Sequence, residues 1–131
     1  MPATILVVDD EKDFTQLVAF HLRRNGHAAL LAHDGEEALD QACRHLPDLI
    51  LLDLMLPQID GFTLCELLRR HPPTHSIPIL LLTALPGQLA RYNGLACGAD
   101  EYLSKPISPA ELIRRIERAL RSPRAAAPGR S

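Results

Sequence analysis

Residues 49–53, Leu-Ile-Leu-Leu-Asp, carry four consecutive aliphatic side chains and end at a carboxylate. A continuous apolar run of this length predicts a strand that is covered on both faces, as in the parallel sheet of an α/β domain. Residues 5–8, Ile-Leu-Val-Val, follow the same pattern and are followed by Asp9 and Asp10. Residues 77–83 are also continuously apolar, so residues 49–53 and 77–83, the third and fourth runs along the chain, are expected to be central strands. The runs at residues 5–8 and 49–53 present acidic side chains at their carboxyl ends.

Outside these two runs, short apolar stretches alternate with amphipathic segments along the chain. The further stretches cover residues 28–32, 77–83 and 102–103. Such alternation is typical of βα units that wrap helices around a parallel sheet. We therefore predict an α/β fold with a doubly wound sheet of five parallel strands.

Helix start signals support this interpretation. Asp34 and Glu37 have the spacing of a capping box. Ser108 and Glu111 repeat that spacing, and Pro109 occupies the first helical position between them. Both positions are expected to begin helices.

Each expected helix has apolar residues at helical spacing, which predicts one buried stripe. The stripe residues are Phe14, Leu17, Val18 and Leu22 in the first helix, Ala38, Leu39 and Ala42 in the second, Phe62, Cys65 and Leu68 in the third, and Leu112, Ile113, Ile116, Ala119 and Leu120 in the last. Gly26 predicts the stop of the first helix. Residues 89–97 predict the weakest helix, because Pro86 and Gly87 precede it and Gly94 interrupts it.

The length of 131 residues suits one hydrophobic core and one domain. We expect residues 1–121 to form that domain, and residues 122–131 to be a flexible tail or linker with too little apolar surface to fold. With 14 basic and 16 acidic side chains, the chain has no general attraction for nucleic acid or an anionic membrane. Direct binding to either is therefore not expected.

No secretory leader and no apolar run of membrane-spanning length is evident in the sequence. A cytoplasmic protein is the expectation. The cysteines Cys43, Cys65 and Cys97 are far apart and odd in number, so we expect them to be reduced and packed.

Acidic side chains follow the first and third expected strands. Asp9 and Asp10 come directly after the first run, and Asp53 comes directly after the third. In an open parallel sheet, ligands bind beyond the carboxyl ends of the strands, where the strand order reverses. Three carboxylates in one such crevice would repel one another unless a cation lay among them. An oxygen site with few protein ligands suits Mg²⁺.

The two remaining strand ends carry a hydroxyl group and an ammonium group. Thr83 ends the fourth run, and Lys105, one of two lysines in the chain, follows the fifth. Phosphoryl transfer uses a nucleophile such as a carboxylate, a metal ion, a fixed cation and a hydrogen-bond donor. Taken singly, each side chain has a plainer explanation, such as a loop start for Asp53 or a solvated position for Lys105. Their joint placement at strand ends favours a phosphoryl-transfer site.

Four blocks of the sequence resemble the receiver domain of response regulators in bacterial two-component signalling. The blocks are Ile5-Leu-Val-Val-Asp-Asp-Glu11, Asp48-Leu-Ile-Leu-Leu-Asp-Leu-Met-Leu-Pro57 with Asp60-Gly61, Pro78-Ile-Leu-Leu-Leu-Thr-Ala84 and Gly98-Ala-Asp-Glu-Tyr-Leu-Ser-Lys-Pro106. The resemblance spans about residues 4–121 and is to single-domain regulators of the chemotaxis kind. It implies a flavodoxin-like sheet with strand order 2-1-3-4-5 and a phosphoacceptor function in a phosphorelay.

The resemblance also implies a role for each matching residue. Asp53 would be the phosphoacceptor and would carry the 4-aspartylphosphate. The expected Mg²⁺ ligands are Asp10, Asp53, the backbone carbonyl of Met55 and, mainly through water, Asp9. Lys105 would contact the phosphoryl group, aimed by a cis peptide before Pro106.

A conformational switch is implied as well. Thr83 would turn its hydroxyl toward the phosphoryl group, and Tyr102 would move inward to fill the space that Thr83 leaves. The face made by the fourth helix, the fifth strand and the fifth helix would then shift its population. The expected partners are a histidine kinase or phosphotransfer protein and a downstream effector. Mixed charges on this face resemble the dimerising surface of winged-helix transcriptional regulators and suggest a phosphorylation-linked homodimer: Arg91, Asp100, Glu101, Arg114, Arg115 and Arg118.

Two other classes of protein are alternatives. A phosphorylation-independent interaction module would be expected to lack the acidic pair, the acceptor or the lysine, all of which this chain has. A hydrolase with an aspartyl-phosphate intermediate would carry an Asp-x-Asp motif after the first strand, where this chain has Asp9-Asp10-Glu11. We therefore expect a receiver that assists its own phosphorylation and dephosphorylation, and not a conventional turnover enzyme. The sequence leaves open whether it acts alone or is linked to an effector domain.

Overall fold

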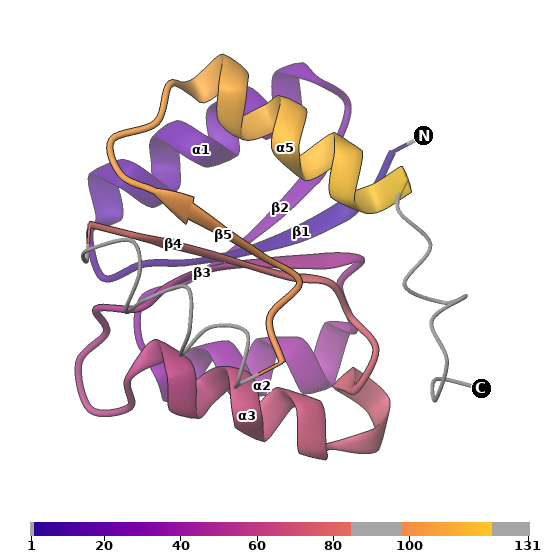
Figure 1. Cartoon of the computed structure of the whole chain (residues 1–131). Helices are drawn as coiled ribbons and strands as arrows, with labels where there is room; N and C mark the ends of the chain where they lie inside the picture. The colour runs from indigo at the N-terminus through magenta and orange to yellow at the C-terminus, as the bar shows by residue number, and fades with distance from the viewer. Residues whose placement is uncertain (1, 85–97, 122–131) are drawn as a thin grey trace.

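The computed structural model describes residues 2–84 and 98–121, in which a parallel sheet lies between two layers of helices (Figure 1). The strands are β1 (Thr4–Val8), β2 (Ala28–Ala32), β3 (Leu49–Asp53), β4 (Ile79–Thr83) and β5 (Glu101–Ser104). The helices are α1 (Lys12–Arg24), α2 (Gly35–His45), α3 (Gly61–Arg70), the short 3-10 helix η1 (Pro72–Thr74) and α5 (Pro109–Arg121). The helix expected at residues 89–97, with Arg91 and Cys97, and the tail expected at residues 122–131 lie outside the described residues.

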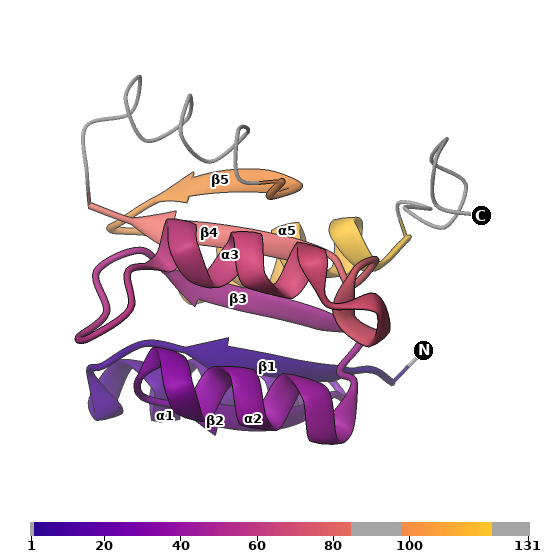
Figure 2. The same ribbon diagram turned by 90° about the horizontal axis from the view of Figure 1, so that it is seen from below.

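The five strands follow the order β2-β1-β3-β4-β5, and every pair is parallel. This confirms the predicted α/β fold and strand order. β1 and β3 are neighbours, with Val8 opposite Leu52, so the strand order reverses between them. The carboxyl ends of the strands lie on the same side of the molecule, at the left of Figures 1 and 2. Both β3 and β4 are buried along their whole length, as their continuous apolar runs predict.

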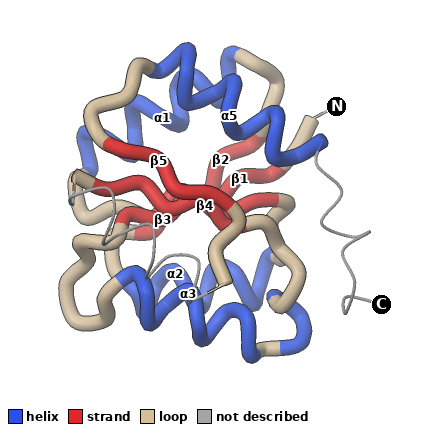
Figure 3. Tube along the Cα trace, viewed as in Figure 1, coloured by secondary structure: helices blue, strands red, loops and turns tan. Residues whose placement is uncertain are grey.

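Figure 3 shows helices on both sides of the sheet, and the strand side chains alternate between these two faces and form two aliphatic cores. On the face covered by α2 and α3, the strand residues include Leu6, Val8, Ile50, Leu52, Ile79 and Leu81. On the face covered by α1 and α5, they include Ile5, Val7, Leu49, Leu51, Leu80, Leu82 and Leu103. The same alternation predicts the face of the sheet to which a side chain at the end of a strand points.

The predicted helix starts are confirmed by their capping bonds. The Asp34 carboxylate accepts a hydrogen bond from the backbone N–H of Glu37 at 2.7 Å, and the Ser108 hydroxyl accepts one from the N–H of Glu111 at 3.1 Å. Each bond satisfies one N–H that the helix itself leaves without a partner. Gly26, beyond α1, has a φ of +85°, the left-handed region that ends helices.

Two burial predictions were wrong. Leu17 is 48% exposed, because the buried stripe of α1 is rotated toward the opposite flank and consists of Thr15, Val18, Ala19 and Leu22. Cys43 on α2 is exposed, whereas Cys65 on α3 is buried as expected. Within the described residues, no helix is both long enough and apolar enough to cross a bilayer.

Candidate functional site

Three carboxylates converge at the carboxyl edge of the sheet, where β1 and β3 end. Asp9, Asp10 and Asp53 each have an oxygen within 4.8 Å of those of the other two. Asp9 is 1% exposed and Asp53 is 5% exposed, whereas Asp10 faces solvent. The crevice that was predicted from the two acidic strand ends is therefore present, with one carboxylate at its opening.

Lys105 brings a positive charge into this crevice. Its Nζ lies 2.8 Å from Asp9 Oδ2 and 3.0 Å from Asp53 Oδ2, and Glu11 Oε1 is 3.8 Å away. The backbone N–H of Lys105 donates to the carbonyl of Thr83 at 2.8 Å, so the start of the loop after β5 is attached to the end of β4. The peptide between Lys105 and Pro106 is cis, as the family resemblance implies.

Both oxygens of Asp53 are held by hydrogen bonds. Oδ1 accepts from the backbone N–H of Met55 at 3.0 Å, and Oδ2 accepts from Lys105. Burial raises the pKa of Asp53 from its ordinary 3.8 to about 6, although the bonds from Met55 and Lys105 act in the opposite direction and the nearby Asp9 adds to the rise. Asp53 is thus mostly ionised at neutral pH, in surroundings that disfavour its charge.

The charge on Lys105 is favoured by the same contacts. Burial alone would lower the pKa of its ammonium group, but the hydrogen bonds to Asp9 and Asp53 outweigh burial and raise that pKa above its usual value. The ammonium group therefore remains charged between the two buried carboxylates. It is a fixed cation within hydrogen-bonding distance of the candidate nucleophile.

Asp9 also connects the crevice to helix α1. Its Oδ1 accepts a hydrogen bond from the backbone N–H of Glu11 at 2.9 Å, while its Oδ2 binds Lys105. Farther along the same turn, the ring centroid of Phe14 lies 4.6 Å from Lys105 Nζ. Sequence reasoning missed the contact of Phe14 with Lys105, because Phe14 fits the core pattern of α1 and no motif marks it.

Thr83 and Tyr102 share the face of the sheet that α2 and α3 cover. Thr83 is fully buried at the end of β4, and Tyr102 packs against the core on that face, opposite Leu81 in the register. Because side chains alternate along a strand, Thr83 points to the same face as Leu81. The two residues that were predicted to be coupled are therefore close neighbours on one face.

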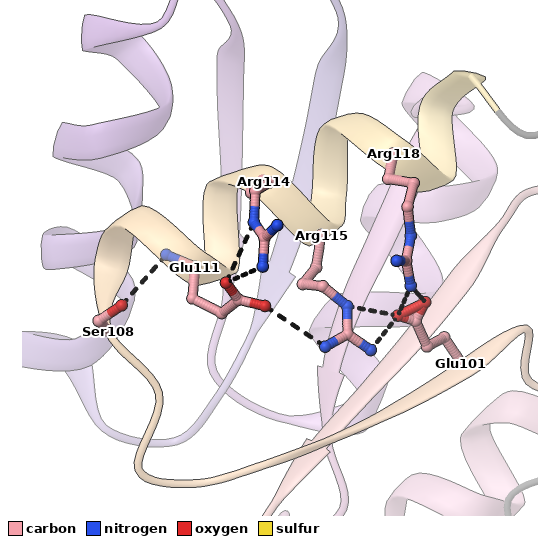
Figure 4. Close-up of polar contacts among 6 residues, drawn as sticks. All are labelled: Glu101, Ser108, Glu111, Arg114, Arg115 and Arg118. Carbon is pink, nitrogen blue, oxygen red and sulfur yellow. Dashed lines mark hydrogen bonds and ion pairs between the residues drawn. The ribbon is translucent and has the colours of Figure 1, made fainter.

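A second cluster of charges lies on β5 and α5 (Figure 4). Glu101 pairs with Arg115 at 2.6 Å and with Arg118 at 3.2 Å. Glu111 contacts Arg114, and it also contacts Arg115 at 3.5 Å. The Arg114 guanidinium lowers the pKa of Glu111, and the hydrogen bond to Glu101 raises the pKa of Arg115. Most charges expected on this face thus pair within the chain.

Asp100 differs from the other charges that were expected on that face. Its carboxylate accepts a hydrogen bond from Arg69 of α3 at 2.8 Å and another from the backbone N–H of Ile79 at 2.8 Å. The Arg69 guanidinium also donates to the carbonyls of Gly98 and Ile77 at 2.8 and 2.7 Å. Asp100 is therefore bound to α3 and to the start of β4.

Three known proteins illustrate the similarity of this chain to others. It is 44% identical over 128 residues to the alkaline phosphatase synthesis transcriptional regulatory protein PhoP of Bacillus subtilis, covering 98% of this chain and 52% of PhoP. It is 45% identical over 116 residues to the response regulator PleD of Caulobacter vibrioides, covering 88% of this chain and 26% of PleD. The chain thus spans about half the length of the first relative and about a quarter of the second.

A solved structure matches over nearly its full length. The chemotaxis response regulator CheY4 of Vibrio cholerae superimposes with a TM-score of 0.86 at 32% identity, covering 91% of this chain and 99% of the CheY4 chain. The family model of the response regulator receiver domain matches residues 5–117. Those residues include the acidic cluster of Asp9, Asp10 and Asp53, and a domain of this family is a receiver and not a conventional turnover enzyme. The chain belongs to the family of response regulator receiver domains.

Proposed function

We propose that this chain is the phosphoacceptor of a two-component phosphorelay, and that Asp53 takes a phosphoryl group from a histidine kinase or phosphotransfer protein. The observation that carries the proposal is the position of Asp53. Its buried carboxylate lies at the end of β3, among the oxygens of Asp9 and Asp10, with Lys105 Nζ 3.0 Å away. This arrangement combines a nucleophile with a fixed positive charge, as phosphoryl transfer requires.

The transfer itself needs little chemistry from the protein beyond positioning and charge stabilisation. With a pKa of about 6, Asp53 is mostly ionised at neutral pH and can act as a nucleophile. A carboxylate oxygen of Asp53 would form a P–O bond while the P–N bond to the donor imidazole breaks. Lys105 would bind one phosphoryl oxygen, and the Thr83 hydroxyl would donate to another.

The donor set of the crevice fits Mg²⁺. It consists of oxygen atoms, one of its carboxylates faces solvent, and the raised pKa of Asp53 reflects a buried charge that a cation would stabilise. We propose as ligands Asp10, Asp53, the Met55 carbonyl and, mainly through water, Asp9. A bound Mg²⁺ would neutralise charge on the phosphoryl oxygens during transfer.

We further propose that phosphorylation shifts the population of the face that includes β5 and α5. Thr83 and Tyr102 are the proposed switch residues, since both belong to the α2 and α3 side of the sheet. That face would bind a downstream effector or output domain, or a second copy of the chain. We also propose a cytoplasmic location, a receiver domain over residues 1–121 and a tail or linker over residues 122–131.

The proposal is tested by incubating the purified chain with acetyl phosphate, with and without Mg²⁺, and measuring intact mass. We expect a labile, Mg²⁺-dependent gain of one phosphoryl group in the wild type and no gain in Asp53→Asn. A folded wild-type chain that gains no mass from acetyl phosphate or from a phosphorylated histidine donor would overturn the proposal. Sedimentation of the same samples tests the homodimer. A particle mass in solution that does not rise on phosphorylation would contradict dimerisation.

A further inference from the structure

An aromatic ring lies against the one lysine of the crevice. Phe14, in the first turns of α1, is partly buried against the core beneath α1 and α5. Its ring centroid lies 4.6 Å from Lys105 Nζ, within the range of about 6 Å at which a ring face attracts a cation. The aromatic ring thus forms one side of the environment of an ammonium group whose other close contacts, among the residues that the structure describes, are carboxylates.

Those carboxylate contacts do not all persist through the proposed reaction. Lys105 Nζ binds Asp9 at 2.8 Å and Asp53 at 3.0 Å. Once an oxygen of Asp53 is bonded to phosphorus, the carboxylate has lost its own negative charge and the lysine must bind the new phosphoryl oxygens. The contact with Asp9 remains, but a single ion pair leaves a long, flexible side chain free to turn about it, and a second contact would restrict its direction. The Phe14 ring can do so without competing as a base or as a metal ligand.

The ring has a defined position because α1 and Lys105 share an anchor. Asp9 binds Lys105 through Oδ2 and accepts the N–H of Glu11 through Oδ1 at 2.9 Å. The first turn of α1 continues from Glu11, whose carbonyl accepts the N–H of Thr15 at 3.1 Å. The start of the helix that carries Phe14 is therefore attached to the same carboxylate as the lysine.

The outer side of this contact is mostly apolar, with Glu11 as its acidic member. Phe14, Leu17 and Ile107 line a shallow groove that also includes Lys105. A smaller aliphatic side chain at position 14 would open this groove beside the ammonium group and remove the ring face. Both changes would leave Lys105 more freedom to turn away from Asp53.

We propose that Phe14 is a positioning residue, whose ring face holds the Lys105 ammonium group toward Asp53 during phosphoryl transfer. The inference rests on the proposed function, because it concerns the rate of that reaction. Phe14 does not touch the phosphoryl group and acts only through Lys105. Its loss should slow the transfer without preventing it.

Four variants test the role of the ring in the full chain. Phe14→Leu keeps an apolar side chain without the ring, and pentafluorophenylalanine at position 14 keeps the shape but reverses the charge distribution of the ring. Phe14→Tyr keeps the ring face. Phe20→Leu is the matched control. Phe20 lies on the same helix and is 53% exposed, and its ring centroid lies 5.6 Å from the Arg24 guanidinium and not beside Lys105.

Phosphorylation by acetyl phosphate with Mg²⁺ is the first measurement. We expect the maximal rate constant to fall about fivefold in Phe14→Leu and in the pentafluoro variant, with an unchanged half-saturating donor concentration. Phe14→Tyr should stay within about twofold of the wild type, and Phe20→Leu should not differ from it. Wild-type rates in both the leucine and the pentafluoro variants would overturn the proposal.

The second measurement detects the contact itself in the metal-free protein. The ε-methylene protons of Lys105 should be shifted upfield by the ring current of Phe14, relative to those of Lys12, the other lysine of the chain. The shift should vanish in Phe14→Leu and persist in Phe14→Tyr. An unshifted wild-type signal overturns the contact, and a shifted signal with an unchanged leucine rate overturns the positioning role. A wild-type chain that takes no phosphoryl group overturns the function on which the inference rests.

Discussion

The crevice and the surface of β5 and α5 both contain clusters of acidic and basic side chains, but the two clusters differ in burial. In the crevice, the side chains of Asp9, Asp53 and Lys105 are 1%, 7% and 20% exposed. On the surface, the side chains of Arg114 and Arg118 are 72% and 62% exposed, and those of Arg115 and Glu101 are 27% and 21% exposed. Contacts of similar length thus occur among mostly buried side chains in the crevice and among partly or largely exposed side chains on the surface.

This difference in burial reverses the direction of the pKa shift. The pKa of Asp53 rises to about 6 even though a lysine lies 3.0 Å away, because desolvation outweighs the attraction. The pKa of Glu111 falls, because at the surface its pairing with Arg114 costs little desolvation. Unfavourable charge is therefore concentrated where the chemistry is proposed, and the surface cluster carries little of it.

The largest effect is expected for the stability of Asp53→Asn without metal. Because the folded-state pKa of Asp53 lies above its ordinary value, ionising Asp53 lowers the free energy of unfolding. This loss is absent below about pH 4 and develops as the pH rises through about 6. A rise from 3.8 to about 6 corresponds to about 3 kcal/mol. In EDTA, we expect the stability advantage of Asp53→Asn over the wild type to grow by up to that amount between pH 4 and pH 7.

Urea denaturation across this pH range measures that advantage. Asp40→Asn is the matched control, because Asp40 lies on the exposed side of α2 and pairs only with Arg44 among the described side chains. An advantage of Asp53→Asn that stays constant from pH 4 to pH 7 would show that burial does not disfavour the charge of Asp53. The comparison between the two clusters would then fail.

Removal of the buried cation should have the next largest effect. Lys105→Met keeps the length of the side chain but leaves Asp9 and Asp53 without their shared positive charge. We expect phosphorylation by acetyl phosphate to slow about 100-fold, which corresponds to about 2.7 kcal/mol. Lys12→Met, at the start of α1, is the control. If both variants slowed equally, Lys105 would have no special role in the transfer.

The smallest effects are expected at the surface cluster. Arg115 binds Glu101 through Nε at 2.9 Å and through Nη2 at 2.6 Å, so Arg115→Ala should cost about 0.5–1 kcal/mol of the free energy of unfolding. Arg114→Ala should cost less, because its side chain is 72% exposed. Thermal denaturation at low and high salt measures both. A cost in the free energy of unfolding for Arg114→Ala as large as the pH-dependent effect expected for Asp53→Asn would contradict the distinction between the two clusters.

Much of the fold could be predicted because local and tertiary signals agree. The Asp34 and Ser108 caps depend on residues three positions apart, and both capping bonds form. The convergence of Asp9, Asp10 and Asp53 depends only on the rule that parallel strands end at one edge. The caps are predictable because they depend on residues a few positions apart. The convergence of the carboxylates is predictable because it follows from a general rule of parallel sheets.

The rest depends on how the elements pack, which spacing does not determine. In α1 the polar Thr15 is buried and the apolar Leu17 is exposed, because the helix is rotated relative to its most hydrophobic side. The contact of Phe14 with Lys105 joins residues on α1 and on the loop after β5. Arg69 contacts Gly98 and Asp100 across the fold, and no short motif relates these positions. Only the three-dimensional arrangement brings such pairs together.

Asp53 and Thr83 are the last residues of β3 and β4, and alternation along these otherwise aliphatic strands assigns them to opposite faces of the sheet. A phosphoryl group on Asp53 would therefore meet the Thr83 hydroxyl at the carboxyl edge of the sheet, where both strands end. The aliphatic interior of the sheet thus separates the two helix-covered faces, and the polar ends of β3 and β4 lie at the carboxyl edge. Interior side chains such as Leu51 and Leu81 need only fill their volume. Aliphatic substitutions there should therefore leave the proposed coupling of Asp53 with Thr83 at the carboxyl edge unchanged.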